Sequence, residues 1–342
     1  MKRFFCIIAV CFAIVPPLLA QESEAPAGFS GSVSAIGRFD ANPYSNLAEG
    51  SQNEWGFSFA NTSLYTVVDL QFAPWLSFSM ENHWLATGEG MPGELYNKTG
   101  HSDYGNWLDW AYLQFSAKDI FLASIGKVSA PRANTEYQDY DFDCFFETVS
   151  SRWNAIQVYQ YGAILEVNPI ENLNFTLGAT TSPYGEKPFN SGLYTYSGMV
   201  KCNIGGVGLM GSYSIWQFDK GASFSESFVP LWSFSLNYEG DAVTFYDDFE
   251  TKAGDQDEIF SEGFSNAIYC KLKLSDSWSL AAKYNYDRYK VYNANVHQPS
   301  IAAFYEPLEG LRIHALAAYK FGDLEKSLNF NVGITYNFTY SF

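Results

Sequence analysis

Cysteine and positive charge are both scarce in this chain of 342 residues. Five cysteines are present, and Cys144, Cys202 and Cys270 lie beyond the N-terminal segment. Their number is odd, and their spacing matches neither a disulfide framework nor a zinc site. Lys and Arg together number 20 against 37 Asp and Glu, which gives a net charge of −17. A chain this acidic would repel phosphates, so nucleic-acid binding is excluded.

Long hydrophobic runs are also missing, with one exception at the N-terminus. An apolar run from Phe4 to Val15 follows two basic residues and precedes two prolines and a small-residue site at Ala20. This order of regions predicts a secretory signal peptide over residues 1–20, followed by a short lead over 21–27. No later stretch reaches the length of about 18 apolar residues that a membrane-spanning helix needs. No linker divides the remainder, so we expect residues 28–342 to form one domain.

Aromatic residues, in contrast, make up 18% of the chain, and its final stretch shows how they are arranged. The even positions are apolar or aromatic: Leu328, Phe330, Val332, Ile334, Tyr336, Phe338, Tyr340 and Phe342. The odd positions are small or polar: Ser327, Asn329, Asn331, Gly333, Thr335, Asn337, Thr339 and Ser341. Because side chains in a strand alternate between two faces, this pattern predicts a β-strand with one apolar and one polar face.

The end of this strand resembles the C-terminal signature of bacterial outer-membrane β-barrels, in which an aromatic residue closes the chain. The resemblance rests on Tyr336, Phe338, Tyr340 and Phe342. It implies that the barrel-assembly machinery reads these residues as an assembly signal and that the chain sits among outer-membrane lipids. A transmembrane strand of this class needs about ten alternating residues with aromatics at the membrane interface, and this stretch provides them.

The same alternation recurs along the whole chain and predicts about sixteen strands, with about fourteen to eighteen as limits. Their approximate ranges are 28–39, 53–72, 75–86, 107–117, 120–130, 156–167, 171–181, 192–204, 206–217, 228–239, 241–250, 263–274, 277–289, 298–306, 310–320 and 326–342. Short turns rich in Gly, Pro, Asp, Asn and Ser alternate with longer loops. We therefore predict an all-β, antiparallel up-and-down transmembrane barrel with short periplasmic turns and longer extracellular loops. Backbone groups cannot stay unpaired in hydrocarbon, so the sheet must close on itself.

A barrel of this strand number leaves a water-filled channel when its inward side chains are small. Strand number, turn rhythm, signal peptide and terminal aromatic together resemble the sixteen-stranded general and substrate-selective porins. The resemblance implies a diffusion channel for ions and small hydrophilic solutes, a homotrimer, and no cofactor. The alternative is a non-conducting surface barrel, an adhesin or a structural protein, whose plugged interior would show as bulky inward residues.

The longest connection, from Pro131 to Ala155, is the third long loop, which in porins looks inward and narrows the pore. Its carboxylates are Glu136, Asp139, Asp141, Asp143 and Glu147. Aromatic residues lie among them and favour a loop that packs against a wall. We assign these acids to a pore constriction. The alternative is an ordinary extracellular loop with solvated charges.

Opposite charges are then expected on the facing wall. Lys271, Lys273, Lys283 and Arg312 fall on the polar phase of three neighbouring predicted strands, roughly half the circumference away. An acidic loop facing a basic wall sets up a transverse field that orients dipolar solutes and discriminates between ions. The alternative is that these residues line a wide vestibule and pair locally with Asp287 or Glu306.

Other candidate sites carry weaker signals. A sixth loop from Asp247 to Glu262 is rich in carboxylates that suit a hard cation, but its spacing matches no EF-hand, and a solvated acidic loop is the better interpretation. Catalysis needs a nucleophile beside a base, and nothing in the sequence places one beside any histidine, so we predict no enzyme. Cys202 and Cys270 fall in phase with apolar neighbours and are expected to face lipid.

Overall fold

The computed structural model describes residues 29–47, 55–58, 62–86, 107–118, 120–138, 159–184, 191–221, 223–224, 227–252, 263–290 and 292–342. The signal peptide and the lead expected over residues 1–27 lie outside these ranges. Within them the chain forms an antiparallel sheet and a short helix, α3 (Thr135–Gln138). No helix in the described ranges is long and apolar enough to cross a membrane.

The sheet contains seventeen strands. The first eight are β1 (Ser30–Asn46), β2 (Trp55–Ser58), β3 (Ser63–Ala73), β4 (Leu76–Ala86), β5 (Trp107–Ala117), β6 (Phe121–Ser129), β7 (Tyr159–Ile170) and β8 (Leu173–Thr181). The others are β9 (Tyr194–Ile204), β10 (Val207–Gln217), β11 (Phe228–Glu239), β12 (Val243–Lys252), β13 (Gly263–Lys273), β14 (Trp278–Tyr289), β15 (Ala294–Leu308), β16 (Leu311–Gly322) and β17 (Ser327–Ser341).

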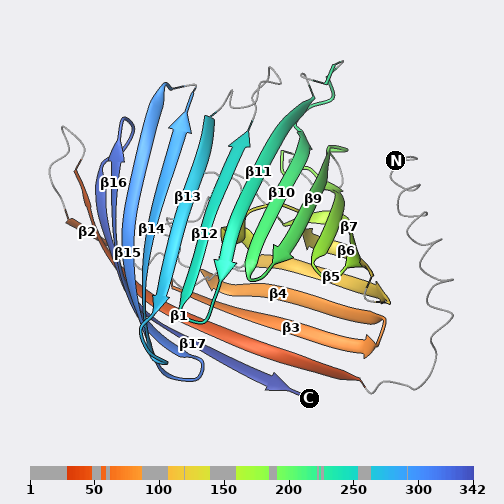
Figure 1. Ribbon diagram of the computed structural model, residues 1–342, viewed down its shortest axis with the longest axis horizontal. Coiled ribbons are helices and arrows are strands. Elements are labelled where there is room, and N and C mark those ends of the chain that lie inside the picture. Colours follow the sequence, from red (N-terminus) through yellow and green to blue (C-terminus); the bar gives the residue numbers. More distant parts are fainter. Residues whose placement is uncertain are drawn as a thin grey trace.

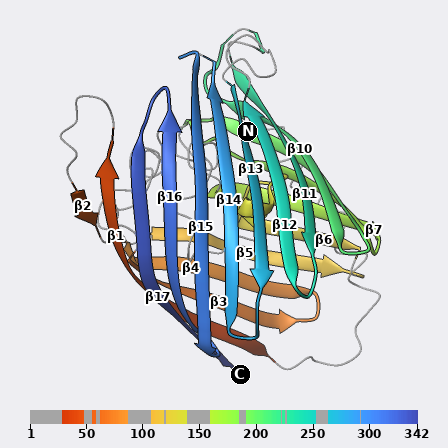
Figure 2. The ribbon, with the colours of Figure 1, turned by 60° about the vertical axis from the view of Figure 1, so that its left-hand side comes forward.

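The sheet closes where the two ends of the chain meet. β1 pairs with β17 from Ser32 opposite Ser341 to Asn46 opposite Ser327. The other edge of β1 pairs with β3, and the remaining strands follow chain order round the wall (Figures 1 and 2). The result is a closed barrel of sixteen strands, and β2 adds a short extra strand beside the end of β1. In the part of the chain that the structure describes, closure pairs both sides of each of the sixteen barrel strands, as the sequence predicted, whereas β2 pairs with β1 alone.

The connections differ in length between the two ends of the barrel. At one end tight turns join neighbouring strands, as at Gly205 and Gly206 between β9 and β10. The first residues of β1 and the last residues of β17 lie on this same side of the barrel. The strand ends that the longer connections join, among them the ends of β4 and β6, lie at the other end. This arrangement confirms the predicted alternation of short turns and long loops.

The two faces of the wall carry different side chains. On β11, Phe234 is 51% exposed on the outside, whereas Ser233 beside it is 0% exposed and faces inward. On β17, Ile334 is exposed and Thr335 is buried. Cys202 shares the outward phase of its apolar neighbours. The predicted pattern of apolar outside and polar inside is therefore confirmed for these strands.

Aromatic side chains gather on the outer face near both ends of the barrel. Near the short-turn end, Trp278 stacks on Tyr305 with ring centroids 4.5 Å apart. Near the long-loop end, His297 lies between Tyr286 and Phe321, at 5.0 and 5.1 Å. Two aromatic belts that flank an apolar band are typical of barrel walls that face lipid.

The largest differences from the predicted strand ranges concern three strands. The first strand was expected to end at residue 39, but β1 continues to Asn46, and Asp40 and Asn42 point into the barrel. The single strand expected over 53–72 is divided into β2 and β3, both of which pair with β1. The strand expected over 298–306 extends over the whole of β15.

Candidate functional site

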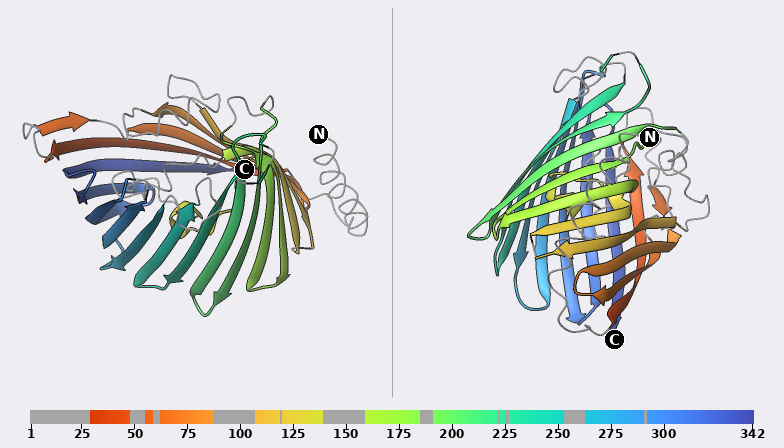
Figure 3. Two further views of the ribbon diagram at one scale, coloured as in Figure 1. Left: turned by 90° about the horizontal axis from the view of Figure 1, so that it is seen from above. Right: turned by 90° about the vertical axis from the view of Figure 1, so that its right-hand side faces the viewer.

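After β6 the chain turns into the barrel, and residues 130–136 form what we call the inward segment. Residues 130–136 are all buried, and Figure 3 shows α3 inside the ring of strands. Pro131 packs against the wall at Gly178 of β8, where an added Cβ would lie 2.7 Å from the proline Cδ. The wall accepts the segment at this point because Gly178 has no side chain.

Arg132 makes the first anchor of this inward segment. Its Nε and Nη2 donate to the two carboxylate oxygens of Glu250 on β12, and both side chains are buried. Ser233 Oγ also donates to Glu250, at 3.0 Å. One residue further on, the Ala133 N–H donates to Ser212 Oγ of β10 at 2.9 Å. A two-pronged pair between arginine and a carboxylate fixes orientation as well as distance.

Asp248, also on β12, binds the start of α3. The N–H groups of Thr135 and Glu136 donate to its two carboxylate oxygens at 2.9 and 2.8 Å. Thr135 Oγ1 lies 2.6 Å from Ser235 Oγ and accepts a hydrogen bond from Asn237 at 3.0 Å. The first N–H groups of a helix have no partner within the helix, so the wall supplies their acceptors.

A second ion pair lies at the end of the anchored segment. Lys283 Nζ of β14 donates to Glu136 Oε1 at 2.5 Å, and the two side chains are 3% and 0% exposed. The ring of Tyr246 lies 5.9 Å from the ammonium. Removing one partner of such a pair leaves a buried unpaired charge, so the pair holds the segment in one place. Glu136 and Lys283, which the sequence assigned to a loop and a facing wall, are thus in direct contact.

The other three predicted basic residues lie nearer the short-turn end. Lys271 of β13 and Arg312 of β16 flank the ring of Phe304 on β15, at 4.9 and 5.4 Å from its centroid. Lys273 pairs with Asp276 in the adjacent turn at 3.1 Å. Because β15 separates β14 from β16, the four basic residues do not lie on three neighbouring strands, and that expectation was wrong.

Local pairing with Glu306, part of the alternative for these cations, is found for Arg312. Arg312 Nη1 lies 3.9 Å from Glu306 Oε1, near the short-turn end. Asp287, the other acid considered, accepts a hydrogen bond from Ser265. The predicted basic residues therefore have different positions. Lys283 is buried and holds the inward segment, whereas Lys271 and Arg312 lie beside Phe304.

Large side chains occupy part of the inner wall between β12 and β16. Tyr246 stacks on Tyr269 with centroids 4.7 Å apart, and Phe304 and Leu316 are buried in the same cluster. Tyr246 faces inward because it alternates in phase with Asp248. The expectation that inward side chains are small is wrong for this part of the wall.

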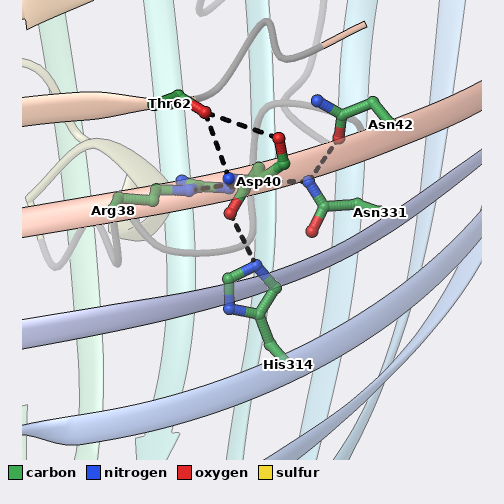
Figure 4. Close-up of polar contacts among 6 residues, drawn as sticks. All are labelled: Arg38, Asp40, Asn42, Thr62, His314 and Asn331. Carbon is green, nitrogen blue, oxygen red and sulfur yellow. Dashed lines mark hydrogen bonds and ion pairs between the residues drawn. The ribbon is translucent and has the colours of Figure 1, made fainter. Parts of the chain in front are cut away.

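A polar cluster joins β1 to β16 and β17, at the place where the barrel closes (Figure 4). Asp40 accepts hydrogen bonds from Arg38 Nε and from Asn331, both at 2.7 Å, and lies 3.1 Å from His314 Nε2. Asn331 also donates to Asn42 Oδ1 at 2.5 Å. All five side chains are buried. These contacts connect the first strand to the last two through charge-assisted hydrogen bonds.

A cavity of about 580 Å³ lies between the inward segment and the wall of β5 to β9. Aromatic rings line it from β5 and β7, and polar side chains line it from β7, β8 and β9. These residues are Trp110, Tyr112, Tyr159, Glu166, Asn174, Thr176 and Lys201. The sequence analysis did not predict this recess because its residues come from five strands, and each of them fits an ordinary inward or interfacial position.

Several predicted site residues lie outside the described ranges, namely Asp139, Asp141, Asp143 and Glu147 of the third loop and the sixth-loop acids beyond residue 252. The beginning of the predicted sixth loop is corrected by the structure. Asp247, Asp248 and Glu250 belong to β12, and the last two hold the inward segment. Their alternation with Phe249 agrees with the strand that the sequence predicted over 241–250.

The residues of the expected assembly signal lie on the outer face of β17. Tyr336, Phe338, Tyr340 and Phe342 are all exposed, in phase with Ile334. This placement agrees with the predicted apolar face, and their role in assembly stays a prediction.

Comparison with known proteins finds similarity in structure and none in sequence families. No protein-family model matches the chain, and no curated protein matches it. The anion-selective porin from Comamonas acidovorans superposes with a TM-score of 0.62 at 12% identity, over 90% of this chain and 100% of that chain. The outer membrane channel DcaP of Acinetobacter baumannii gives a TM-score of 0.60 at 11% identity, over 92% and 99% of the two chains.

A third structure, the trimer form of OmpT, an outer membrane protein of Vibrio cholerae, gives a TM-score of 0.60 at 12% identity, over 90% of this chain and 99% of that chain. These identities are low, and the similarity establishes the fold. The chain has the fold of outer-membrane porins.

Proposed function

We propose that this chain is an outer-membrane porin, a water-filled channel through which ions and small hydrophilic solutes diffuse passively. The observation that carries the proposal is the inward segment, which is bound to the inner face of a closed sixteen-strand wall. A closed barrel is one of the two backbone arrangements that hydrocarbon allows. A barrel of this size also encloses more space than its wall side chains fill.

The location and orientation follow from the same architecture. The short-turn end faces the periplasm and the long loops face the cell exterior, as in the outer-membrane barrels that the chain resembles. Tyr336, Phe338, Tyr340 and Phe342 act as the signal for the barrel-assembly machinery. The trimer form of OmpT supports a homotrimer for this chain as well.

The third loop forms the constriction. Its described start is held against the wall through Arg132 and Glu136. Asp139, Asp141, Asp143 and Glu147 follow Glu136 by three to eleven residues, which favours a position inside the barrel. Lys283 is neutralised by Glu136 and Lys273 pairs with Asp276 at the mouth, so Lys271 and Arg312, whose contact with Glu306 is long at 3.9 Å, supply the positive side of the field.

A second candidate function is a non-conducting barrel with a surface or structural role. The observation that favours it is the cluster of Tyr246, Tyr269, Phe304 and Leu316, which fills part of the inner wall with bulky side chains. The cavity beside the inward segment favours the channel, because space for solute lies next to the loop.

Swelling of liposomes separates the two candidates. Vesicles that contain the purified, folded chain are diluted into isotonic solutions of glycerol, arabinose, sucrose and raffinose, and their turbidity is followed. We expect swelling that slows as the solute becomes larger, and no swelling in vesicles prepared with heat-denatured protein. Equal turbidity traces for the folded and the denatured protein with every solute would establish the non-conducting barrel instead.

A further inference from the structure

The recess beside the inward segment has the dimensions of a ligand site. Its volume of about 580 Å³ lies within the roughly 300–1,000 Å³ that is usual for small-molecule pockets. Residues 129–132 line one side of it, at the point where the chain leaves β6. Arg132 is fixed by its ion pair with Glu250, so this boundary of the recess is rigid.

The hydrogen-bonding groups of the recess project from three neighbouring strands. Glu166 of β7 lies opposite Thr176 of β8, and Asn174 lies opposite Lys201 of β9. Asn174 donates to Glu166 Oε2 at 3.3 Å and accepts from Thr176 Oγ1 at 2.8 Å. The side chain of Lys201 makes no hydrogen bond or ion pair with any residue that the structure describes. Donors and acceptors are thus presented together from the wall.

The charges of the recess balance. Glu166 and Lys201 carry opposite charges on the same lining, and Arg132 is neutralised by Glu250. A cavity without net charge attracts neither a small anion nor a small cation strongly, since electrostatic selection depends on an excess of one sign. A neutral solute with many hydrogen-bonding groups fits this lining best.

Aromatic rings supply the apolar part of the recess. Trp110 of β5 and Tyr159 of β7 lie 5.7 Å apart, with their planes at 45°. The indole Nε1–H of Trp110 donates to Ser79 Oγ at 3.0 Å, which fixes the orientation of its ring. Tyr112 completes this side. Rigid rings of this size offer a large apolar surface at little conformational cost.

We propose that the recess binds a neutral sugar, a monosaccharide or disaccharide, during its passage through the barrel. The C–H faces of a sugar ring stack on Trp110 and Tyr159, and its hydroxyl groups bond to Asn174, Glu166 and Lys201. A sugar combines an apolar ring face with hydroxyls that both donate and accept, as this lining requires. The proposal rests on the proposed channel function and adds a preferred solute class to it.

Isothermal titration calorimetry in detergent micelles tests binding without reference to transport. Sucrose is the probe, with glycylglycine as a zwitterion and sodium benzoate as an anion. We expect sucrose to bind, and Trp110→Leu to weaken its binding by at least about tenfold through lost ring contact. Trp278→Leu, which removes a tryptophan from the outer face, is the matched control and should bind as the parent does. Stronger binding of glycylglycine or benzoate than of sucrose overturns the proposal.

A second substitution in the recess tests the site even if Trp110→Leu does not fold. Lys201→Gln keeps a donor but removes the charge, and Lys326→Gln makes the same change in a turn at the long-loop end. Heat-modified gel mobility shows which variants are folded. Among folded proteins, we expect Lys201→Gln to weaken sucrose binding severalfold and Lys326→Gln to leave it unchanged. Unchanged binding in both Trp110→Leu and Lys201→Gln places the sugar elsewhere and overturns the site.

Current recordings distinguish failure of the site from failure of the channel. In planar bilayers in KCl, sucrose should reduce the current through the parent protein and have a much smaller effect on Trp110→Leu. Conductance without any effect of sucrose, together with no heat of binding, leaves the channel and removes the sugar site. Sucrose binding in micelles by a folded protein that conducts no ions overturns the channel and the proposed passage of the sugar.

Discussion

Asp40 and His314 lie on strands that are not neighbours, yet their side chains approach to 3.1 Å above Gly333. Gly333 of β17 is in register with Asp40 on one side and with His314 on the other. An added Cβ at this glycine would lie 2.0 Å from Asp40 Oδ1 and 2.6 Å from His314 Nε2. Because Gly333 has no side chain, it leaves the space in which Asp40 of β1 and His314 of β16 meet across β17.

Replacing this glycine should weaken the closure of the barrel. Gly333→Ala forces Asp40 and His314 apart, and we expect a loss of about 1–3 kcal/mol in the free energy of unfolding, as for other overpacked sites. Gly37→Ala is the matched control, because an added Cβ there meets nothing within 4 Å. Urea unfolding in lipid vesicles measures both variants. Equal loss in the two would mean that the contact above Gly333 has no part in closure.

The two faces of β17 should respond differently to the same charge. Ile334→Arg places a cation on the apolar outer face near mid-strand and should cost about 2–4 kcal/mol in a bilayer. Asn337→Arg places it on the inward phase, at an exposed position nearer the end of the strand. Thr335 also faces inward, but it is buried opposite Arg38 and Arg312, so an added arginine there would be placed beside two cations. Comparable folded fractions of the two arginine variants on a heat-modified gel would contradict the face assignment.

The buried pair of Glu136 and Lys283 should control the position of the third loop. Each of Glu136→Gln and Lys283→Gln leaves a buried charge without its partner, at a cost of up to about 3–5 kcal/mol. The double variant removes both charges and should lose less than the sum of the single losses. We expect larger and noisier single-channel currents in the single variants. Strict additivity in stability, with unchanged currents, would contradict a role for the pair in holding the loop.

The carboxylates beyond the anchor should set ion preference. Neutralising Asp139, Asp141 and Asp143 to Asn should shift the reversal potential in a salt gradient towards anions, because charges within narrow low-dielectric walls are weakly screened. Neutralising Lys271 and Arg312 to Gln should shift it the other way.

The matched control for this shift is Asp255, Asp257 and Glu258, neutralised together in the sixth loop. We expect a small effect that disappears at about 1 M salt, where the Debye length is about 3 Å. A larger shift from the sixth loop than from the third loop at high salt would place the constriction elsewhere.

Strand positions could be predicted wherever the two faces differ clearly in polarity. β5 and β11 begin and end where the sequence predicted, at 107–117 and 228–239. Prediction failed where an inward polar residue has the composition of a turn. Asp40 and Asn42 suggested the end of a strand, although both face the interior. Asp248 and Glu250 were correctly placed in a strand over 241–250, and only the overlapping sixth-loop range misassigned them.

For the interior of the barrel, the sequence predicted which charges face inward but did not predict which residues are in contact. The acidic, aromatic loop and the inward lysines were visible in the sequence, but the pairing of Glu136 with Lys283 joins residues 147 positions apart. Alternation gives the face of each residue and says nothing about its height along the wall. For the same reason, Phe304 between Lys271 and Arg312 was not foreseen.

The most direct test of the proposed channel is the conductance of the purified, folded chain in a planar lipid bilayer. We expect discrete current steps on insertion in KCl, with a current that rises with salt concentration and a reversal potential that depends on the third-loop acids. Heat-modified gel mobility and protease resistance of the same preparation establish that the barrel is folded and inserted. A folded, inserted barrel that carries no current in any salt would contradict the proposal that the interior is an open, water-filled path.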